Sequence, residues 1–518
     1  MKLSRITLAM AAACGAMASA PSFGITASNY SNTGEFTGDT LNIRISGASA
    51  QDAGVLGSAL SLCVAGTVHR YAISNNFAFF CNPDIGTNPG QIQVPARAAS
   101  LGGPITKLAI YKYAVGGSAF GVEAVESNSA TDGSVVGSTG NLLPFLDLAK
   151  INSSLATATN AVTSNLTFGP GTNGSYVNVL FSTLVSTTSV TTPATTYIGL
   201  SDVEPAFFSN NTVGLTATPQ TALIFGPIVS KNVYDRLQTL QGLTAPGCGA
   251  TLESEGCMPS LTSAQITSLY TQPGQAWSTF GITGLANDSV YIARRVDSSG
   301  TQKVFEAVIA GTPNGQSGLK SCQSGVDSFA LPDSGTTSGD PAVACTVGIS
   351  IGGAAVAVPT VFAGSGGGDV RACLIAHQAN GRSAIGILTT EDKPTTANNW
   401  RFVKVDGVAP NQANTAAGRY RFYTETSFNT RSTGTFATAS QPGYTAFVNR
   451  LKADLANPTI LAQVNGADQT YGKAGLMALL SLQAAGTVAD FTGASSDIPW
   501  TKTVGAAVNN CQRPKLFN

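Results

Sequence analysis

Four segments of the chain share one pattern: an apolar run typical of a strand, a turn of small or polar residues, and apolar residues at helical spacing. The runs cover residues 41–45, 105–115, 197–200 and 289–293, and the turns after them cover residues 47–49, 116–118, 201–202 and 294–301. Repeated strand, turn and helix units predict an α/β fold with helices on the faces of parallel sheets. Ligands in such folds bind at the carboxyl ends of the strands, so we expect the turns to carry any site.

Long segments rich in Ser, Thr, Asn, Gly or Pro separate these units. They lie near residues 80–103, 127–193 and 314–342, and we interpret them as surface insertions. The second insertion contains two apolar clusters, Leu142–Leu148 and Val177–Leu184, which predict that it is partly folded.

The composition limits the classes of partner. A chain of 518 residues with 43% hydrophobic residues can form two or more domains with substantial cores. Charged residues make up only 11%, and the 28 basic and 28 acidic side chains balance. A neutral chain lacks the long-range field that attracts nucleic acid or an anionic membrane surface. We therefore expect no nucleic-acid partner, and any recognition of an anion must be local.

The first 20 residues predict a signal peptide. Lys2 and Arg5 form a basic start, an apolar run follows, and small residues lead to Ala18 or Ala20. No later stretch reaches the ~18 uninterrupted apolar residues of a membrane-spanning helix. The sequence thus predicts an exported protein.

Eight cysteines remain once Cys14 leaves with the signal peptide. An even number in an exported protein favours disulfides, and a metal site is disfavoured because the spacings match no zinc pattern and the chain has only two histidines. Closeness in sequence favours pairing Cys63 with Cys81 and Cys248 with Cys257, and leaves the other pairings open. In chain order the candidates are Cys63, Cys81, Cys248, Cys257, Cys322, Cys345, Cys373 and Cys511.

The fourth turn carries the residue types that bind an oxyanion. Arg295 can form a bidentate, charge-assisted pair with a tetrahedral oxyanion, and Ser299 and Thr301 offer hydroxyl groups. Gly300 lets backbone approach closely, and Asp297 lies two residues from Arg295, where it can hold the guanidinium in position. The alternative is an ordinary charged surface turn. Its place between an apolar strand and a helix favours a site.

The other three turns offer a hydroxyl group or a carboxylate. Ser49 starts a predicted capping box with Asp52 and stands at a helix amino terminus, where free N–H groups bind anions. The alternative is that such serines, Ser118 included, only cap helices. Asp202 can accept a hydrogen bond from hydrogen phosphate but cannot bind fully ionised sulfate, and this difference would select phosphate. Here the alternative is a solvent-facing aspartate at the end of a strand.

Together these residues resemble the periplasmic phosphate-binding proteins that serve ABC transporters. Residues 47–50, 116–118 and 199–202 resemble three ligand loops of that family, and residues 294–301 are similar to its fourth loop almost residue for residue. Ala50 stands where the family has an aromatic residue. The resemblance implies a supporting role for Asp297 and ligand contacts by Ser49, Ala50, Ser118, Asp202, Arg295, Ser299, Gly300 and Thr301.

The resemblance also implies a fold and a function. The fold would be a two-lobed α/β, periplasmic-binding-protein-like fold with mixed, mainly parallel sheets, large Ser/Thr/Gly-rich insertions and disulfides. Lobe 1 would comprise residues 41–225 and 411–518, and lobe 2 residues 226–410. The protein would be periplasmic, extracellular or at the cell surface, and would capture phosphate or a related oxyanion between the lobes for an ABC transporter. It would use no cofactor or metal and would not be an enzyme.

Two alternatives to this function are open. A surface or extracellular structural or assembly protein could reuse the same scaffold and self-associate through its insertions. A phosphatase would need a metal centre or an activated nucleophile, which two histidines, His69 and His377, and the absence of a clustered carboxylate motif disfavour.

Overall fold

The structure is a computed structural model. The predicted signal peptide, Cys322, Cys511 and most of the predicted insertions near 80–103 and 314–342 lie outside the residues that it describes. Those residues are 40–61, 63, 69–73, 76–81, 107–126, 142–147, 150, 162–168, 177–183, 191–196, 198–208, 214–243, 248, 254–272, 274–310, 344–346, 350–351, 354–355, 358, 360–392, 394, 399–431, 444–458, 461, 475–482, 497–502 and 514–516.

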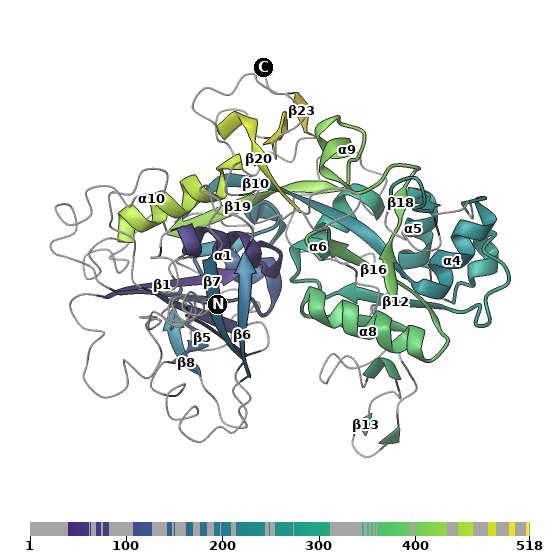
Figure 1. The fold of residues 1–518 in the computed structure, drawn as a ribbon, viewed down its shortest axis with the longest axis horizontal. Helices are drawn as coiled ribbons and strands as arrows, with labels where there is room; N and C mark the ends of the chain where they lie inside the picture. The colour runs from purple at the N-terminus through teal and green to yellow at the C-terminus, as the bar shows by residue number, and fades with distance from the viewer. Residues whose placement is uncertain are drawn as a thin grey trace, which may run out of the picture.

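Two long strands connect the two lobes seen in Figure 1. They are β10 (Leu215–Ser230) and β19 (Tyr423–Arg431). The amino-terminal part of β10 pairs with β19 up to Ile224, and its carboxyl-terminal part pairs with β16 (Ser383–Thr389) from Phe225 onward. One strand therefore belongs to both lobes, and a single mixed sheet runs through the molecule.

The first lobe is built around β1, which lies between two parallel partners, β4 and β9. The sheet continues antiparallel from β4 into β3 and β2, and then parallel into β7. Helices α1 and α10 belong to this lobe, and β5 and β8 form a separate pair. The bounds are β1 (Thr40–Gly47), α1 (Asp52–Ser61), β2 (His69–Ile73), β3 (Asn76–Cys81), β4 (Lys107–Tyr113), β5 (Leu142–Leu146), β6 (Val162–Phe168), β7 (Val177–Thr183), β8 (Thr191–Thr195), β9 (Ile198–Ser201) and α10 (Tyr444–Leu455).

The second lobe is built around β12, which lies parallel to β15 on one side and to β16 on the other. Helices α4, α5, α6 and α8 surround this part of the sheet (Figure 1). The bounds are α4 (Lys231–Leu240), β11 (Ser260–Leu261), α5 (Ser263–Thr271), β12 (Val290–Arg295), α6 (Gly300–Phe305), β13 (Ser350–Ile351), β14 (Ala354–Ala355), β15 (Val361–Gly364), α8 (Gly367–Ala379), β17 (Trp400–Phe402) and β18 (Lys404–Val405).

The remaining described elements lie toward the carboxyl terminus. Strand β20 joins the sheet through β10 and pairs with β21, while β22 and β23 pair with each other. The bounds are α9 (Gln412–Ala416), β20 (Leu476–Leu479), β21 (Asp497–Ile498), β22 (Trp500–Thr501) and β23 (Lys515–Leu516).

The predicted α/β class is confirmed. Strands β1, β4, β9 and β12 lie on the four predicted apolar runs, and their parallel pairing places several carboxyl ends on common edges of the sheet. Antiparallel pairing takes a larger share than the resemblance implied, because β10 and β19 cross between the lobes and β2, β3 and β4 form a meander. The second insertion does contain strands: β5 and β7 lie on its two apolar clusters, and β8 and β6 pair with them.

Two of the four predicted helices are different in the structure. Helices α1 and α6 follow β1 and β12 as expected, but β4 and β9 lead into short 3-10 turns at Gly117–Gly121 and Pro205–Phe207. The first turn starts at Gly116 and Gly117, whose φ angles of 81° and 74° are left-handed. Its Ala119 N–H donates to Ser298 O at 3.0 Å instead of continuing a helix.

Both disulfides that closeness in sequence favoured are present. Cys63 bonds to Cys81, and Cys248 bonds to Cys257. A third disulfide, which the sequence left open, joins Cys345 to Cys373 on α8. His377 lies beside it, and the two sulfur atoms and an imidazole nitrogen lie within 4.8 Å of one another. Because those sulfur atoms are bonded to each other, the group is a disulfide packed against a buried histidine.

No helix in the described part of the chain is long and apolar enough to cross a membrane.

Candidate ligand-binding site

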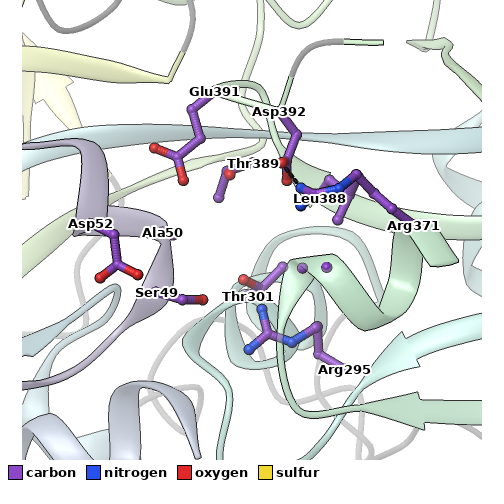
Figure 2. Close-up of a pocket in the computed structure, with 12 residues that line it drawn as sticks. Ser49, Ala50, Asp52, Arg295, Thr301, Arg371, Leu388, Thr389, Glu391 and Asp392 are labelled. Atoms are coloured by element: carbon purple, nitrogen blue, oxygen red, sulfur yellow. Dashed lines mark ion pairs between the residues drawn. The ribbon is translucent and has the colours of Figure 1, made fainter. Parts of the chain in front are cut away.

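A cavity of about 180 Å³ lies where segments from both lobes meet. Its walls come from the carboxyl ends of β12 and β16 and from the segments that follow β1, β12, β15 and β16 (Figure 2). Four of the eight predicted ligand residues line it. The complete lining is Ser49, Ala50, Asp52, Arg295, Thr301, Gly367, Gly368, Arg371, Leu388, Thr389, Glu391 and Asp392.

Arg295 is the last residue of β12, and its side chain is buried. Its Nε donates to Gly364 O at 3.2 Å and its Nη2 donates to Ser365 O at 2.7 Å. Burial lowers the pKa of Arg295, while Asp202 and Asp369 raise it. Two neutral carbonyl groups thus fix the guanidinium plane at the edge of the cavity, with Asp202 and Asp369 as nearby negative charges.

The partner predicted for Asp297 is wrong. Its carboxylate lies 2.7 Å from Nη1 of Arg294, and the same nitrogen donates to the carbonyl of Arg295. Successive side chains of a strand point to opposite faces of the sheet, so Arg294 and Arg295 diverge. The Asp297 side chain, which is 57% exposed, lies on the side of Arg294 and pairs with it. Asp297 therefore positions the neighbouring arginine.

Ser299 and Thr301 lie at the start of α6 with their hydroxyl groups buried. Ser299 occupies the N-cap position, yet its side chain makes no capping hydrogen bond. Within the described part of the chain neither hydroxyl oxygen has a hydrogen-bond partner. A buried, unpaired polar group costs roughly 1–3 kcal/mol, and the burial of both residues does not fit the alternative of an ordinary charged surface turn. They are suited to bind a ligand.

Ser49 does not form the predicted capping box. It lies in a 3-10 turn (Ser49–Gln51), and Asp52 begins α1 directly after that turn. Asp52 Oδ1 instead lies 3.1 Å from Nζ of Lys112, so its carboxylate does not fold back onto the backbone of the turn. In Figure 2 the Ser49 hydroxyl points toward that of Thr301, which belongs to the other lobe.

Lys112, a residue that the sequence reasoning missed, holds the first turn in place. It is fully buried, and its Nζ donates to Gly47 O at 2.8 Å and to Ala48 O at 3.2 Å. Burial lowers the pKa of Lys112 and raises that of Asp52 to about 6, although the charge of each residue partly offsets the effect of burial on the pKa of the other. The signal was present: a lysine inside the apolar run of β4 predicts a buried charge with a partner.

Ser118, Asp202 and Gly300 lie together but apart from the cavity lining. The Asp202 N–H donates to Ser118 Oγ at 2.9 Å. A Cβ on Gly300 would lie 2.3 Å from that oxygen and 2.6 Å from Asp202 Cβ, so only glycine fits there. Burial raises the pKa of Asp202 to about 6, against the lowering effect of Arg295. The loops of the two lobes are thus in direct contact beside the cavity.

The turn between β15 and α8 is a fifth strand, turn and helix unit, which the sequence reasoning did not pick out. Gly367 and Gly368 from the first turn of α8 line the cavity. The N–H of Gly366 and the hydroxyl of Ser365 both donate to Asp369 Oδ2, which fixes the entry to the helix. The apolar run before a glycine-rich turn was the signal that could have found it.

Carboxylates from the segment after β16 form the rest of the lining. Asp392 makes an ion pair with Arg371 of α8, seen as a dashed line in Figure 2. Glu391 points into the cavity, and its Oε2 has no hydrogen-bond partner among the described residues. Burial, with the nearby Asp52 and Asp202, raises the pKa of Glu391 well above its usual range. Nothing in the sequence patterns pointed to this segment.

Comparisons with known proteins give distant likenesses only. No protein-family model matches the chain, and no curated protein sequence does. Among solved structures, a protein from Clostridium perfringens described as a phosphate ABC transporter substrate-binding protein with bound phosphate is 14% identical, with a TM-score of 0.30, over 52% of this chain and 77% of its own.

Two further structures are similar to about the same degree. An ABC-type phosphate transport receptor from Vibrio cholerae is 13% identical, with a TM-score of 0.28, over 50% of this chain and 74% of its own. PstS from Borrelia burgdorferi is 11% identical, with a TM-score of 0.26, over 57% of this chain and 87% of its own. At such values the likenesses carry no conclusion about what this chain binds, which has to be argued from its own residues.

Proposed function

We propose that this chain is an exported solute-binding protein that captures phosphate, or a related oxyanion, between its two lobes without chemical conversion. One observation carries the proposal. Arg295 and Thr301 from one lobe and Ser49 from the other line a single cavity, beside buried hydroxyl groups that have no hydrogen-bond partner among the described residues. The residue division suggested by the sequence, 41–225 with 411–518 against 226–410, is part of the proposal, and the change of partner along β10 at Ile224 and Phe225 supports it.

Capture would proceed by replacing the water around the anion. Arg295 would supply a fixed positive charge, Ser49, Ser299 and Thr301 would donate hydrogen bonds from their hydroxyl groups, and the first turn of α8 would supply backbone N–H groups. Ala50 and Gly300 would offer close backbone contacts, as the family resemblance implies. Arg295, Ser49, Thr301 and the first turn of α8 already line the cavity, so little reorganisation would oppose their contacts with the ligand.

Asp202 and Ser118 would act in this proposal as a check on the proton of the ligand. Hydrogen phosphate can donate to an ionised Asp202, whereas sulfate has no proton to give. Because Asp202 lies beside the lining and not within it, this role requires the loops at Ser118 and Gly300 to separate slightly when the ligand enters.

The proposed location and partner follow from the same function. Three disulfides support export to an oxidising compartment, the periplasm or the cell exterior. The released cargo would pass to an ABC transporter in the membrane.

Isothermal titration of the purified protein with inorganic phosphate tests the proposal. We expect binding by the wild type and a loss of roughly 100-fold in Arg295→Met, since a charge-assisted hydrogen bond contributes about 1.5–3 kcal/mol. Arg294→Met is the matched control, because Arg294 pairs with Asp297 outside the cavity. No heat of binding at millimolar phosphate in the wild type, or equal binding by Arg295→Met, would refute the proposal.

A further inference from the structure

The cavity is larger than one tetrahedral oxyanion requires. Its volume of about 180 Å³ equals roughly six water molecules at ~30 Å³ each. In Figure 2, Arg295 and Thr301 lie at one end, and Asp52 and Glu391 lie at the other. An anion held by Arg295 therefore leaves room for a second group of the same ligand.

The two ends carry opposite charge. Within the lining, Arg371 makes an ion pair with Asp392 and also interacts with the charge of Glu391. Arg295 instead makes its hydrogen bonds to neutral carbonyl groups. At the other end, Lys112 lies behind Asp52 and balances it. Glu391 differs, because its Oε2 is buried and, among the residues described, has no hydrogen-bond partner. Thr389 forms a side-chain hydrogen bond with Glu391, and Arg371 favours its charged form, but one of its two carboxylate oxygens has no donor among these residues.

An inorganic phosphate alone does not explain Glu391. A carboxylate beside a bound anion repels it, and a buried acceptor without a donor costs free energy in every state of the protein. Burial and the neighbouring carboxylates of Asp52 and Asp202 favour the neutral, protonated form of Glu391 while the cavity holds no ligand. A cationic group of the ligand would reverse that preference and satisfy Oε2. Thr389, which also lines this end, already forms a side-chain hydrogen bond with Glu391, and its hydroxyl oxygen can accept another from the ligand.

We propose that the cavity binds a phosphate monoester or phosphonate that carries a protonated amine. The phosphoryl group would lie at Arg295 and Thr301, and the ammonium group would donate to Glu391 and the hydroxyl of Thr389. This inference rests on the proposed function and names the class of ligand for the same site. Glu391 is then the residue that distinguishes an aminoalkyl ligand from a plain phosphate ester.

Titration with three probes tests the inference. O-Phosphoethanolamine and ethyl phosphate have the same phosphate ester and nearly the same length, and only the first carries an amine; inorganic phosphate is the third probe. We expect the wild type to bind O-phosphoethanolamine at least tenfold more tightly than ethyl phosphate, because close charge pairs contribute about 1.5 kcal/mol or more. Glu391→Gln, which keeps shape but not charge, should reduce that ratio to about one to threefold.

A matched control separates the role of Glu391 from a general loss of negative charge. Asp297→Asn also converts one carboxylate to an amide, but Asp297 does not line the cavity, so the ratio should stay as in the wild type. Thermal unfolding confirms that each variant is folded.

The outcomes distinguish the two proposals. If inorganic phosphate binds but the wild type does not prefer O-phosphoethanolamine over ethyl phosphate, the inference is wrong and the oxyanion site stands. A preference that Glu391→Gln leaves intact also overturns it. If none of the three probes binds, both proposals fail. A preference that disappears in Glu391→Gln, even with weak binding of inorganic phosphate, supports the inference.

Discussion

The two ends of the cavity differ in how their charges are balanced. We call them the arginine wall (Arg295, Thr301, Gly367 and Gly368) and the carboxylate wall (Asp52 and Glu391). On the arginine wall the guanidinium is held by two neutral carbonyl groups, so its charge stays available. On the carboxylate wall the fully buried Lys112 neutralises Asp52. The arginine wall therefore holds its cation through neutral groups, whereas the charge of Asp52 on the carboxylate wall stabilises the fold through Lys112.

The largest expected effect tests whether Lys112 maintains the carboxylate wall. Lys112→Met leaves the Asp52 carboxylate and two carbonyl groups without their buried donor. We expect a loss of about 3–5 kcal/mol in the free energy of unfolding, the usual cost of breaking a buried pair. Urea unfolding measures it.

The double variant Lys112→Met with Asp52→Asn sharpens this result. Removing the unpaired charge should restore part of the lost stability, and the mutant cycle gives the coupling of the pair. If Asp52→Asn does not relieve the loss, the lysine acts through the carbonyl groups of the turn alone.

Gly300→Ala is expected to have the next largest effect, because it forces the loops of the two lobes apart. Its Cβ would lie 2.3 Å from Ser118 Oγ and 2.6 Å from Asp202 Cβ. Overpacking of this kind costs roughly 1–3 kcal/mol. Gly256→Ala is the control, since a Cβ there meets nothing within 4 Å. Equal thermal stability of the two variants would show that the loops separate at no cost.

The pH dependence of sulfate binding tests which carboxylate distinguishes phosphate from sulfate by the proton of the ligand. Burial raises the pKa of Asp202 to about 6, against the influence of Arg295 and Lys112, so it is ionised at pH 7.5 and mostly protonated at pH 5. A protonated Asp202 can donate to sulfate. We therefore expect discrimination between phosphate and sulfate to fall by up to about tenfold as the pH drops, since one pKa unit corresponds to about 1.4 kcal/mol.

Competition titrations at both pH values give this ratio. Asp202→Asn should make it nearly independent of pH, while Asp52→Asn should not, although the pKa of Asp52 is also raised to about 6 by burial. If Asp52→Asn abolishes the pH dependence instead, the check belongs to the carboxylate wall.

The smallest expected effect concerns Asp297. Asp297→Asn removes the exposed partner of an ion pair with the buried Arg294, and pairs open to solvent on one side contribute about 0–1 kcal/mol. Phosphate affinity should stay within about twofold of the wild type, which corresponds to less than 1 kcal/mol. A large loss of affinity would restore the role that the sequence assigned to Asp297.

Predictions from the sequence succeeded where the signal was local. Apolar runs followed by small-residue turns correctly located β1, β4, β9 and β12, because strand formation and glycine turns depend on neighbouring residues. Short separations likewise identified two disulfides. Arg295 and Thr301 were found for the same reason, since a charged, glycine-containing turn between strand and helix is visible in one stretch of sequence.

The three-dimensional fold decided what depends on distant residues. The partner of Asp297 follows from the alternation of side chains along β12, and the helix expected after Gly117 is replaced by a turn bonded to Ser298. Glu391 lies 96 residues after Arg295 in the chain and reaches the same cavity only through the sheet. The sequence by itself determined which four segments form strands ahead of small-residue turns, and one cation that lines the cavity. Only the tertiary structure decided which charges face each other, because the pairing of buried charges depends on proximity in space.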